Sequence, residues 1–208
     1  MKATIFDYGA GNLHSIGKAL AAAGVEVAVE SDPLAALDTD LLVLPGVGAF
    51  GAACERLAPG REAMRRALAA GLPCLGVCLG LQLLFESSDE GEGLGLGLVP
   101  GRVRRLRAAR VPQMGWNEVV SLDPLFSRAA LDVAYFANGF VVEPDDPARV
   151  TAWSEHEGDR FPAAVRVART LGVQFHPEKS SRAGLALIAG FVAELAPAAA
   201  TPSPEARR

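Results

Sequence analysis

Residues 74–82 read CLGVCLGLQ, and this stretch decides the fold. An apolar run of strand length ends in Gly76-Val77-Cys78-Leu79-Gly80, and a helical pattern follows. This is the pattern of a nucleophile elbow, a sharp strand-to-helix turn, with cysteine in the place of serine. Such a turn strains the backbone of its central residue, and flanking glycines make room for the neighbouring chain. We therefore expect Cys78 to project from the carboxyl end of a strand.

The position after such a strand suits a nucleophilic thiol. The N-terminus of the following helix favours the thiolate form of Cys78. The backbone N–H of Leu79 would face the place where an oxyanion forms. The alternative is a buried structural cysteine, since free cysteine is often found in cores.

The first half of the chain alternates apolar runs with helical patterns. The pattern predicts strands at residues 3–6, 25–29, 41–44 and 74–77, and helices at 12–23, 61–70 and 79–85. Strands that alternate with helices indicate right-handed βαβ units and a parallel sheet.

The second half has a different character, because breakers such as Asp-Pro and Glu-Pro separate short apolar runs. The pattern predicts strands at residues 103–106, 118–121, 135–140, 150–153, 164–168 and 170–174, and a last helix at 181–195. Without long helices between them, antiparallel hairpins are expected here. The fold class is thus α/β, with an open parallel or mixed sheet, flavodoxin-like and flanked by helices, and antiparallel strands in the second half. We expect one domain over residues 1–196 and a disordered tail over 197–208.

Composition excludes several classes of protein. Of 208 residues, 50% are hydrophobic and the net charge is -4, which suits a folded core and not a nucleic-acid or lipid surface. No signal peptide or membrane-spanning run is visible, so the chain is expected to be cytoplasmic. Three sparse cysteines favour neither disulfides nor zinc, and no metal or cofactor is expected. Five arginines between residues 102 and 110 form either a solvated face or a surface for a partner or anionic ligand.

Two further segments carry candidate chemistry. His176 and Glu178 follow an apolar strand and are two residues apart, so in extended backbone they share a face. Glu178 could then hold one imidazole nitrogen while the other faces a thiol. The rival histidines, His14 and His156, do not end a buried strand. The other segment, residues 44–48, is either an ordinary tight turn or a loop whose glycines let Val47 present a second oxyanion N–H.

Together these segments resemble the class I glutamine amidotransferases. The resemblance spans about residues 2–195 and rests on five segments in order: DYGAGNL at 7–13, PGVGAF at 45–50, the elbow, MGWN at 114–117 and HPEKS at 176–180. It implies that Cys78 is the nucleophile, His176 the general base and acid, and Glu178 the orienting carboxylate. It also implies that Val47 and Leu79 supply the oxyanion N–H groups.

The resemblance extends to substrate and partner. It implies that Gly48, Gln82 and Glu90 hold glutamine. It also implies a heterodimer in which ammonia passes to a (β/α)₈ cyclase of histidine biosynthesis. The residues expected at that interface are Asn12, Lys18, Trp116 and Lys179.

Other interpretations stay open from sequence alone. A glutaminase for a different ammonia-using synthase would keep the triad, and a non-catalytic flavodoxin-like module would keep only the sheet. Two positions depart from the family pattern. Residues 138–140 read Asn-Gly-Phe where His-Ser/Thr-Tyr is usual, and Gln113 stands where His is common. These departures put side-chain contacts near the substrate pocket in doubt, although backbone contacts could survive.

Overall fold

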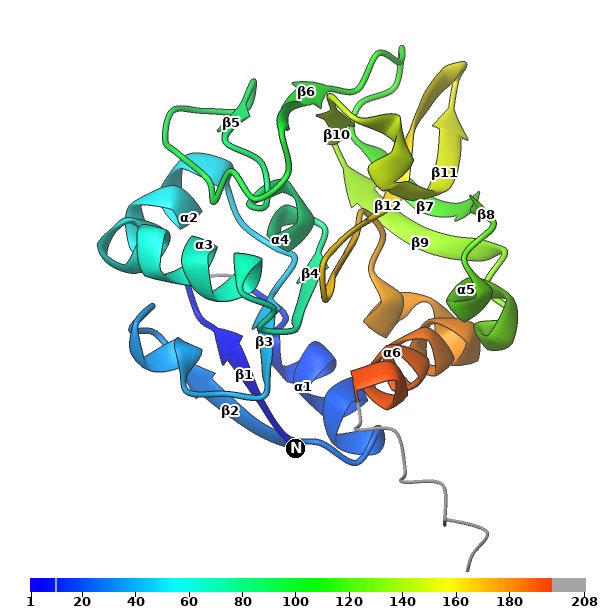
Figure 1. Cartoon of the computed structure of the whole chain (residues 1–208). Coiled ribbons are helices and arrows are strands. Elements are labelled where there is room, and N and C mark those ends of the chain that lie inside the picture. The colour runs from blue at the N-terminus through cyan, green and yellow to red at the C-terminus, as the bar shows by residue number, and fades with distance from the viewer. Residues whose placement is uncertain (10, 196–208) are drawn as a thin grey trace, which may run out of the picture.

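A mixed sheet of eight strands forms the centre of the molecule (Figure 1). The computed structural model describes residues 1–9 and 11–195, so the tail expected to be disordered lies outside the described residues. The strand order is β2 (Glu26–Glu30), β1 (Lys2–Phe6), β3 (Leu41–Leu44), β4 (Cys74–Val77), β13 (Thr170–Val173), β12 (Asp159–Val167), β11 (Val150–His156) and β8 (Val120–Ser121).

One half of this sheet is parallel and the other is antiparallel. The pairs from β2 to β13 are all parallel, and those from β13 to β8 are all antiparallel. Strands β3, β4 and β13 are buried along their whole length, as expected for parallel strands covered on both faces. The predicted fold class, with antiparallel strands in the second half, is confirmed.

Two smaller sheets complete the second half. The first joins β10 (Phe140–Pro144), β6 (Gly101–Arg105) and β5 (Ser87–Ser88), and the second pairs β7 (Gln113–Glu118) with β9 (Val133–Asn138). The single strand predicted at residues 135–140 is wrong, because the chain passes at Gly139 from β9 in one sheet to β10 in the other.

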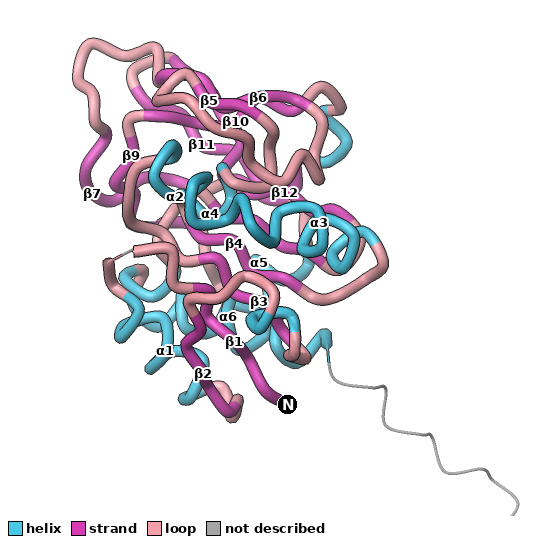
Figure 2. Tube along the Cα trace, turned by 90° about the vertical axis from the view of Figure 1, so that its left-hand side faces the viewer, coloured by secondary structure: helices cyan, strands magenta, loops and turns pink. Residues whose placement is uncertain are grey.

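Helices cover both faces of the large sheet. One core holds side chains of α1 (Leu13–Ala22), α5 (Pro124–Ala129) and α6 (Ser181–Leu195). The opposite core holds those of α2 (Phe50–Leu57), α3 (Arg61–Ala69) and α4 (Leu79–Gln82). Figure 2 shows this second group on the side of the sheet that faces the viewer. None of the described helices is long and apolar enough to cross a membrane.

Two helices were not predicted, for physical reasons. The N-terminus of α2 follows a glycine-rich loop and has no side-chain cap of its own; instead, Phe50 N donates to the Glu90 carboxylate at 2.9 Å, 40 residues away. In α5 the Asp123-Pro124 pair starts a helix instead of breaking one. Asp123 accepts a 2.9 Å bond from Leu125 N as N-cap, and proline fits the first turn. The helix expected over residues 79–85 ends early, at Gln82.

Candidate active site

Four loops meet at the carboxyl edge of the parallel strands. They follow β1, β3, β4 and β13, which are consecutive in the sheet. Ligands of open α/β sheets bind at this edge. Each candidate catalytic residue lies in one of these loops, so the topology brings together segments that are more than a hundred residues apart.

Cys78 occupies the strained turn that the elbow pattern predicts. Its backbone has φ 46° and ψ -102°, which residues other than glycine rarely adopt. A Cβ on Gly80 would clash with the Leu44 carbonyl, so only glycine lets α4 pack this closely against β3. Leu79 is the first residue of α4, and its N–H therefore has no partner inside the helix.

The His176–Glu178 pair has the geometry expected from its spacing. His176 Nδ1 lies 2.9 Å from Glu178 Oε1, and both side chains are buried. The His176 backbone N–H donates to the Tyr135 carbonyl at 2.8 Å, and Pro177 opens the short 3-10 helix η4 (Pro177–Lys179). This helix turns the Glu178 side chain back towards Nδ1 of the imidazole.

The imidazole of His176 also contacts the elbow cysteine. Burial opposes a positive charge on this ring, but the hydrogen bonds and charges of Cys78 and Glu178 outweigh burial and raise the pKa of His176 to about 9. At neutral pH the ring is therefore an imidazolium beside the sulfur. A cationic ring in that place holds a proton ready for a leaving group.

The loop after β3 lies against the imidazole. A Cβ on Gly46 would lie 2.9 Å from His176 Cε1, so glycine is needed for this close approach. Tyr8 donates a hydrogen bond to the Pro45 carbonyl, and Val47 forms an isolated antiparallel bridge with Gly11. Burial raises the pKa of Tyr8, so the phenol keeps its proton and its donor role. The segment after β1 thus anchors the loop that carries Val47.

A cavity of about 270 Å³ opens between these loops. Of the residues predicted for the site, it is lined by Val47, Gly48, Cys78, Leu79, Gln82, Glu90, His176 and Lys179. Residues 137–140, which include the departure from the family pattern, form another wall. A larger cavity of about 740 Å³ lies among Met1, Pro73 and Arg169, at the amino ends of the parallel strands and far from any of this chemistry.

Backbone contacts survive at the segment that departs from the family. The Phe140 carbonyl accepts from Gln82 Nε2 at 3.1 Å and from Asn138 Nδ2 at 3.1 Å. Asn138 and Gln113 are both buried and lie opposite each other in the β7–β9 ladder. The unusual side chains are therefore part of the wall behind the cavity.

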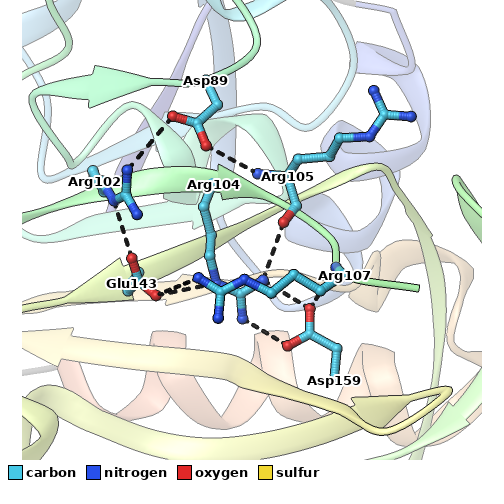
Figure 3. A network of polar contacts seen from close by, with 7 residues as sticks. All are labelled: Asp89, Arg102, Arg104, Arg105, Arg107, Glu143 and Asp159. Carbon is cyan, nitrogen blue, oxygen red and sulfur yellow. Dashed lines mark hydrogen bonds and ion pairs between the residues drawn. The ribbon is translucent and has the colours of Figure 1, made fainter.

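The arginine cluster forms ion pairs within the chain (Figure 3). Arg104 is buried and makes two bonds to Asp159, of 2.7 and 2.8 Å, so a solvated face is the wrong interpretation for this residue. Arg102 lies 3.0 Å from Glu143 and 3.8 Å from Asp89, the residue before Glu90. The network ties the Glu90 loop to β6 and β10.

Asp159 is the buried anchor of this network. Burial raises the pKa of its carboxyl, but hydrogen bonds from the Arg104 side chain and the Arg107 backbone N–H outweigh burial and lower the pKa below its usual value. The carboxylate therefore stays charged wherever the protein is folded near neutral pH.

The residues predicted for a partner interface lie in different settings. Trp116 is 56% exposed and packs edge-on against Tyr135, over whose ring the Lys179 ammonium lies at 5.9 Å. Lys18 is exposed on α1. Asn12 is half-buried, and its amide donates to Glu178 Oε1 at 2.7 Å, so it contacts the candidate triad directly. This contact of Asn12 was not predicted from the sequence.

One polar residue at the site was given no role from sequence. Gln174 is fully buried and its amide lies 3.4 Å from Cys78 Sγ. The available signal was strand alternation, because Gln174 has the same parity as His176 and so extends to the same side of the strand.

Comparison with known proteins identifies the family. The model of the class I glutamine amidotransferase family matches residues 4–195. This chain belongs to that family. It is 49% identical over 195 residues to the imidazole glycerol phosphate synthase subunit HisH of Thermus thermophilus, an alignment that covers 91% of this chain and 96% of the relative. The subunit of the same name from Halobacterium salinarum is 44% identical over 199 residues, covering 90% and 91%.

Solved structures of the family share the fold. The structure of PurLQS from Thermotoga maritima matches with a TM-score of 0.71 at 21% identity, over 94% of this chain and 99% of that chain. A crystal structure described as a glutamine amidotransferase matches with a TM-score of 0.69 at 20% identity, over 90% and 98%. In this amidotransferase fold the elbow cysteine and His176 meet at one cavity, and Glu178 bonds to His176 Nδ1.

Proposed function

We propose that this chain is the glutaminase subunit of an imidazole glycerol phosphate synthase, which serves histidine biosynthesis. It hydrolyses glutamine to glutamate and ammonia. The observation that carries the proposal is the convergence of Cys78 and His176 at one cavity, with Glu178 bonded to the far side of the imidazole. The chain's relatives bear that subunit name over nearly their whole length.

The reaction uses the three residues in sequence. The Cys78 thiolate attacks the carboxamide carbon of glutamine, and the carbonyl oxygen becomes an oxyanion. His176 gives its proton to the amide nitrogen, the C–N bond breaks, and ammonia leaves a glutamyl thioester on Cys78. Neutral His176 then takes a proton from water, whose oxygen attacks the thioester and releases glutamate with the thiolate restored. Glu178 keeps Nδ1 occupied, so that Nε2 serves the thiol side.

The oxyanion is stabilised by the N–H groups of Leu79 and Val47. Leu79 supplies a helix N-terminal donor in the resting chain. We propose that Val47 supplies the second donor only after its peptide turns towards the cavity, and that its bridge to Gly11 holds the loop until then. One missing donor costs about 10²–10³ in rate, so this arrangement would keep the lone subunit nearly idle. The partner would release the loop when its own ligand is bound.

Glutamine is held on the opposite side of the cavity. The nitrogen of the Gln82 amide is engaged by the Phe140 carbonyl, which leaves the amide oxygen to accept from the substrate's ammonium group. Glu90 and Gly48 line the same cavity. Because Glu90 also caps α2, next to the Val47 loop, substrate binding and loop position are linked through one carboxylate.

The partner is a (β/α)₈ cyclase that receives the ammonia in a heterodimer. Exposed Trp116 and Lys179 gather around Tyr135 beside the cavity, and an aromatic anchor beside a charge is the kind of contact that dominates interfaces. Lys18 and Asn12 would flank this surface. The cytoplasmic location stays a prediction.

Two measurements test this function. A reactive glutamine analogue should label Cys78 covalently in the full chain, and peptide mapping should find no label on Cys54 or Cys74. Co-purification should recover the cyclase, and ammonia release from glutamine should rise when the cyclase and its ribotide ligand are added. Recovery of a different synthase would support another pathway, and an unlabelled Cys78 would remove the glutaminase assignment.

A further inference from the structure

Gln174 takes no part in the mechanism above, yet it contacts the reacting sulfur. It follows β13 directly, is fully buried, and its Nε2 lies 3.4 Å from Cys78 Sγ. A buried glutamine needs partners for its amide, and most find them in backbone groups or other side chains. Here one of the partners is the nucleophile itself.

A chain of hydrogen bonds fixes which way the amide faces. The Phe140 carbonyl can only accept, so the group of Gln82 that lies 3.1 Å from it must be the NH₂. The same NH₂ lies 3.4 Å from the Gln174 amide, which must therefore present its oxygen on that side. The NH₂ of Gln174 is left to face Cys78. The Phe140 carbonyl therefore determines the orientation of the Gln174 amide through Gln82.

The sheet fixes where this amide lies. Val173 pairs with Val77 in the parallel β13–β4 ladder, so the next residues along, Gln174 and Cys78, lie side by side. Cys78 N donates to the Val173 carbonyl at 2.7 Å, and Gln174 N donates to the Ala163 carbonyl at 2.9 Å. These bonds hold both backbones at the point where the side chains meet.

The alternation of side chains along the strand places His176 as well as Gln174 beside Cys78 Sγ. Gln174 and His176 extend to one side of the chain, while Phe175 packs into the core against Phe126 and Phe136. The sulfur therefore has an imidazole on one side and an amide NH₂ on another. A thiolate is an acceptor, and N–H donors aimed at it stabilise the charged form.

We propose that Gln174 is a further residue of the reaction, one that donates an amide N–H to the Cys78 thiolate and fixes its direction of attack. Gln82 is the positioning residue that orients this amide. The proposal rests on the proposed glutaminase function and deepens it, because Gln82 also lines the substrate cavity. Substrate bound at Gln82 is then linked through two amides to the nucleophile.

The test is the pH dependence of Cys78 alkylation by iodoacetamide in the full chain, read by peptide mapping. Burial raises the pKa of Cys54 to about 11 and raises that of Cys74 further, so these two thiols react slowly and are resolved from Cys78. Gln174→Met keeps the volume and removes the donor. Its alkylation profile should move up by about one to two pH units, the worth of one hydrogen bond to a charged group.

Thr170→Val is the matched control, since it removes a buried polar atom from the same strand, four residues before Gln174. It should leave the profile unchanged. Gln82→Leu, which frees the Gln174 amide to turn, should move the profile up by less than Gln174→Met. If Gln174→Met does not fold, Gln174→Glu keeps the shape and the contact with Gln82, and should move the profile at least as far.

A folded Gln174→Met or Gln174→Glu variant with the wild-type profile would overturn the proposal and leave Gln174 a structural residue. Steady-state hydrolysis of glutamine also distinguishes a donor to the thiolate from a structural residue. Loss of the donor should lower kcat about tenfold while KM for glutamine changes little. Alkylation needs neither glutamine nor a partner, so failure here is distinguishable from failure of the glutaminase assignment, which the labelling by a glutamine analogue tests.

Discussion

Asn12 and His176 share one oxygen of Glu178. The Asn12 amide donates to Glu178 Oε1 at 2.7 Å, and His176 Nδ1 lies 2.9 Å from the same atom. Asn12 lies in the segment after β1 and has a left-handed backbone, with φ 70°. The triad carboxylate is therefore held in place by a loop from another strand.

Asn12→Gly tests this arrangement, because glycine removes the amide and tolerates the left-handed backbone. A free Glu178 orients the imidazole less well, so kcat for glutamine hydrolysis should fall about tenfold with little change in KM. The measurement is steady-state kinetics at saturating partner, together with complex formation. A variant that loses only complex formation would make Asn12 an interface residue and nothing more.

Gly48→Pro tests the loop that carries Val47. Gly48 has φ 146°, whereas proline requires about -65°, so the loop could not keep its present path. Stimulation of glutaminase activity by the partner should fall by about 10² or more, the worth of one oxyanion donor.

Gly71→Pro is the matched control for that variant, since Gly71 also has a positive φ, of 104°, but follows α3 away from the site. It should lower the melting temperature and leave the stimulation intact. Equal loss of stimulation in both variants would mean that the effect is general strain.

Asp159→Asn tests the buried ion pair of Figure 3. The substitution removes the buried countercharge of Arg104 and leaves only the part-exposed Glu143, 3.2 Å from Arg104 Nε. It should cost at most about 3–5 kcal/mol of unfolding free energy at pH 7. Because the folded pKa of Asp159 is lowered, its stabilisation is complete above the unfolded pKa of about 4 and is lost as pH falls through the folded value. The difference between wild type and variant should be constant near neutrality and shrink below about pH 4. A difference that grows on acidification would contradict this sign.

Lys179→Ala and Trp116→Ala test the partner surface. Lys179→Ala should reduce the fraction of ammonia that reaches product. Trp116→Ala should weaken the binding free energy of assembly by about 2–5 kcal/mol, the cost of losing a desolvated contact. The assays are complex formation, leaked ammonia and cyclised product. Lys2→Ala and Trp153→Ala remove the same side chains outside the proposed surface and serve as controls. Test variants that match these controls in all three assays would remove Trp116 and Lys179 from the interface.

Much of the fold could be predicted, because parallel strands and amphipathic helices are encoded locally. Runs such as residues 41–44 and 74–77 are apolar throughout, and the structure has β3 and β4 within those bounds. The helix α2 could not be predicted, since its cap comes from Glu90, 40 residues away. The break at Gly139 was also invisible, because it depends on which of two sheets each half of the segment joins.

The candidate site, like the fold, has features that were predicted from the sequence and features that were not. Cys78 and the His176–Glu178 pair follow local patterns, and the structure brings them together as expected. The contacts of Asn12 and Gln174 span 166 and 96 residues, and each depends on which strands are neighbours in the sheet. Spacing along the chain carries no information about such contacts.

The most direct test of the proposed role of Cys78 is product synthesis by the Cys78→Ala complex with glutamine or with ammonium as the nitrogen source. Glutamine should support no synthesis, because no thioester can form, while ammonium should support synthesis at the wild-type rate. Retained synthesis from glutamine would contradict the role of Cys78. Loss of both activities in a folded, assembled complex would contradict the division of labour between glutaminase and partner.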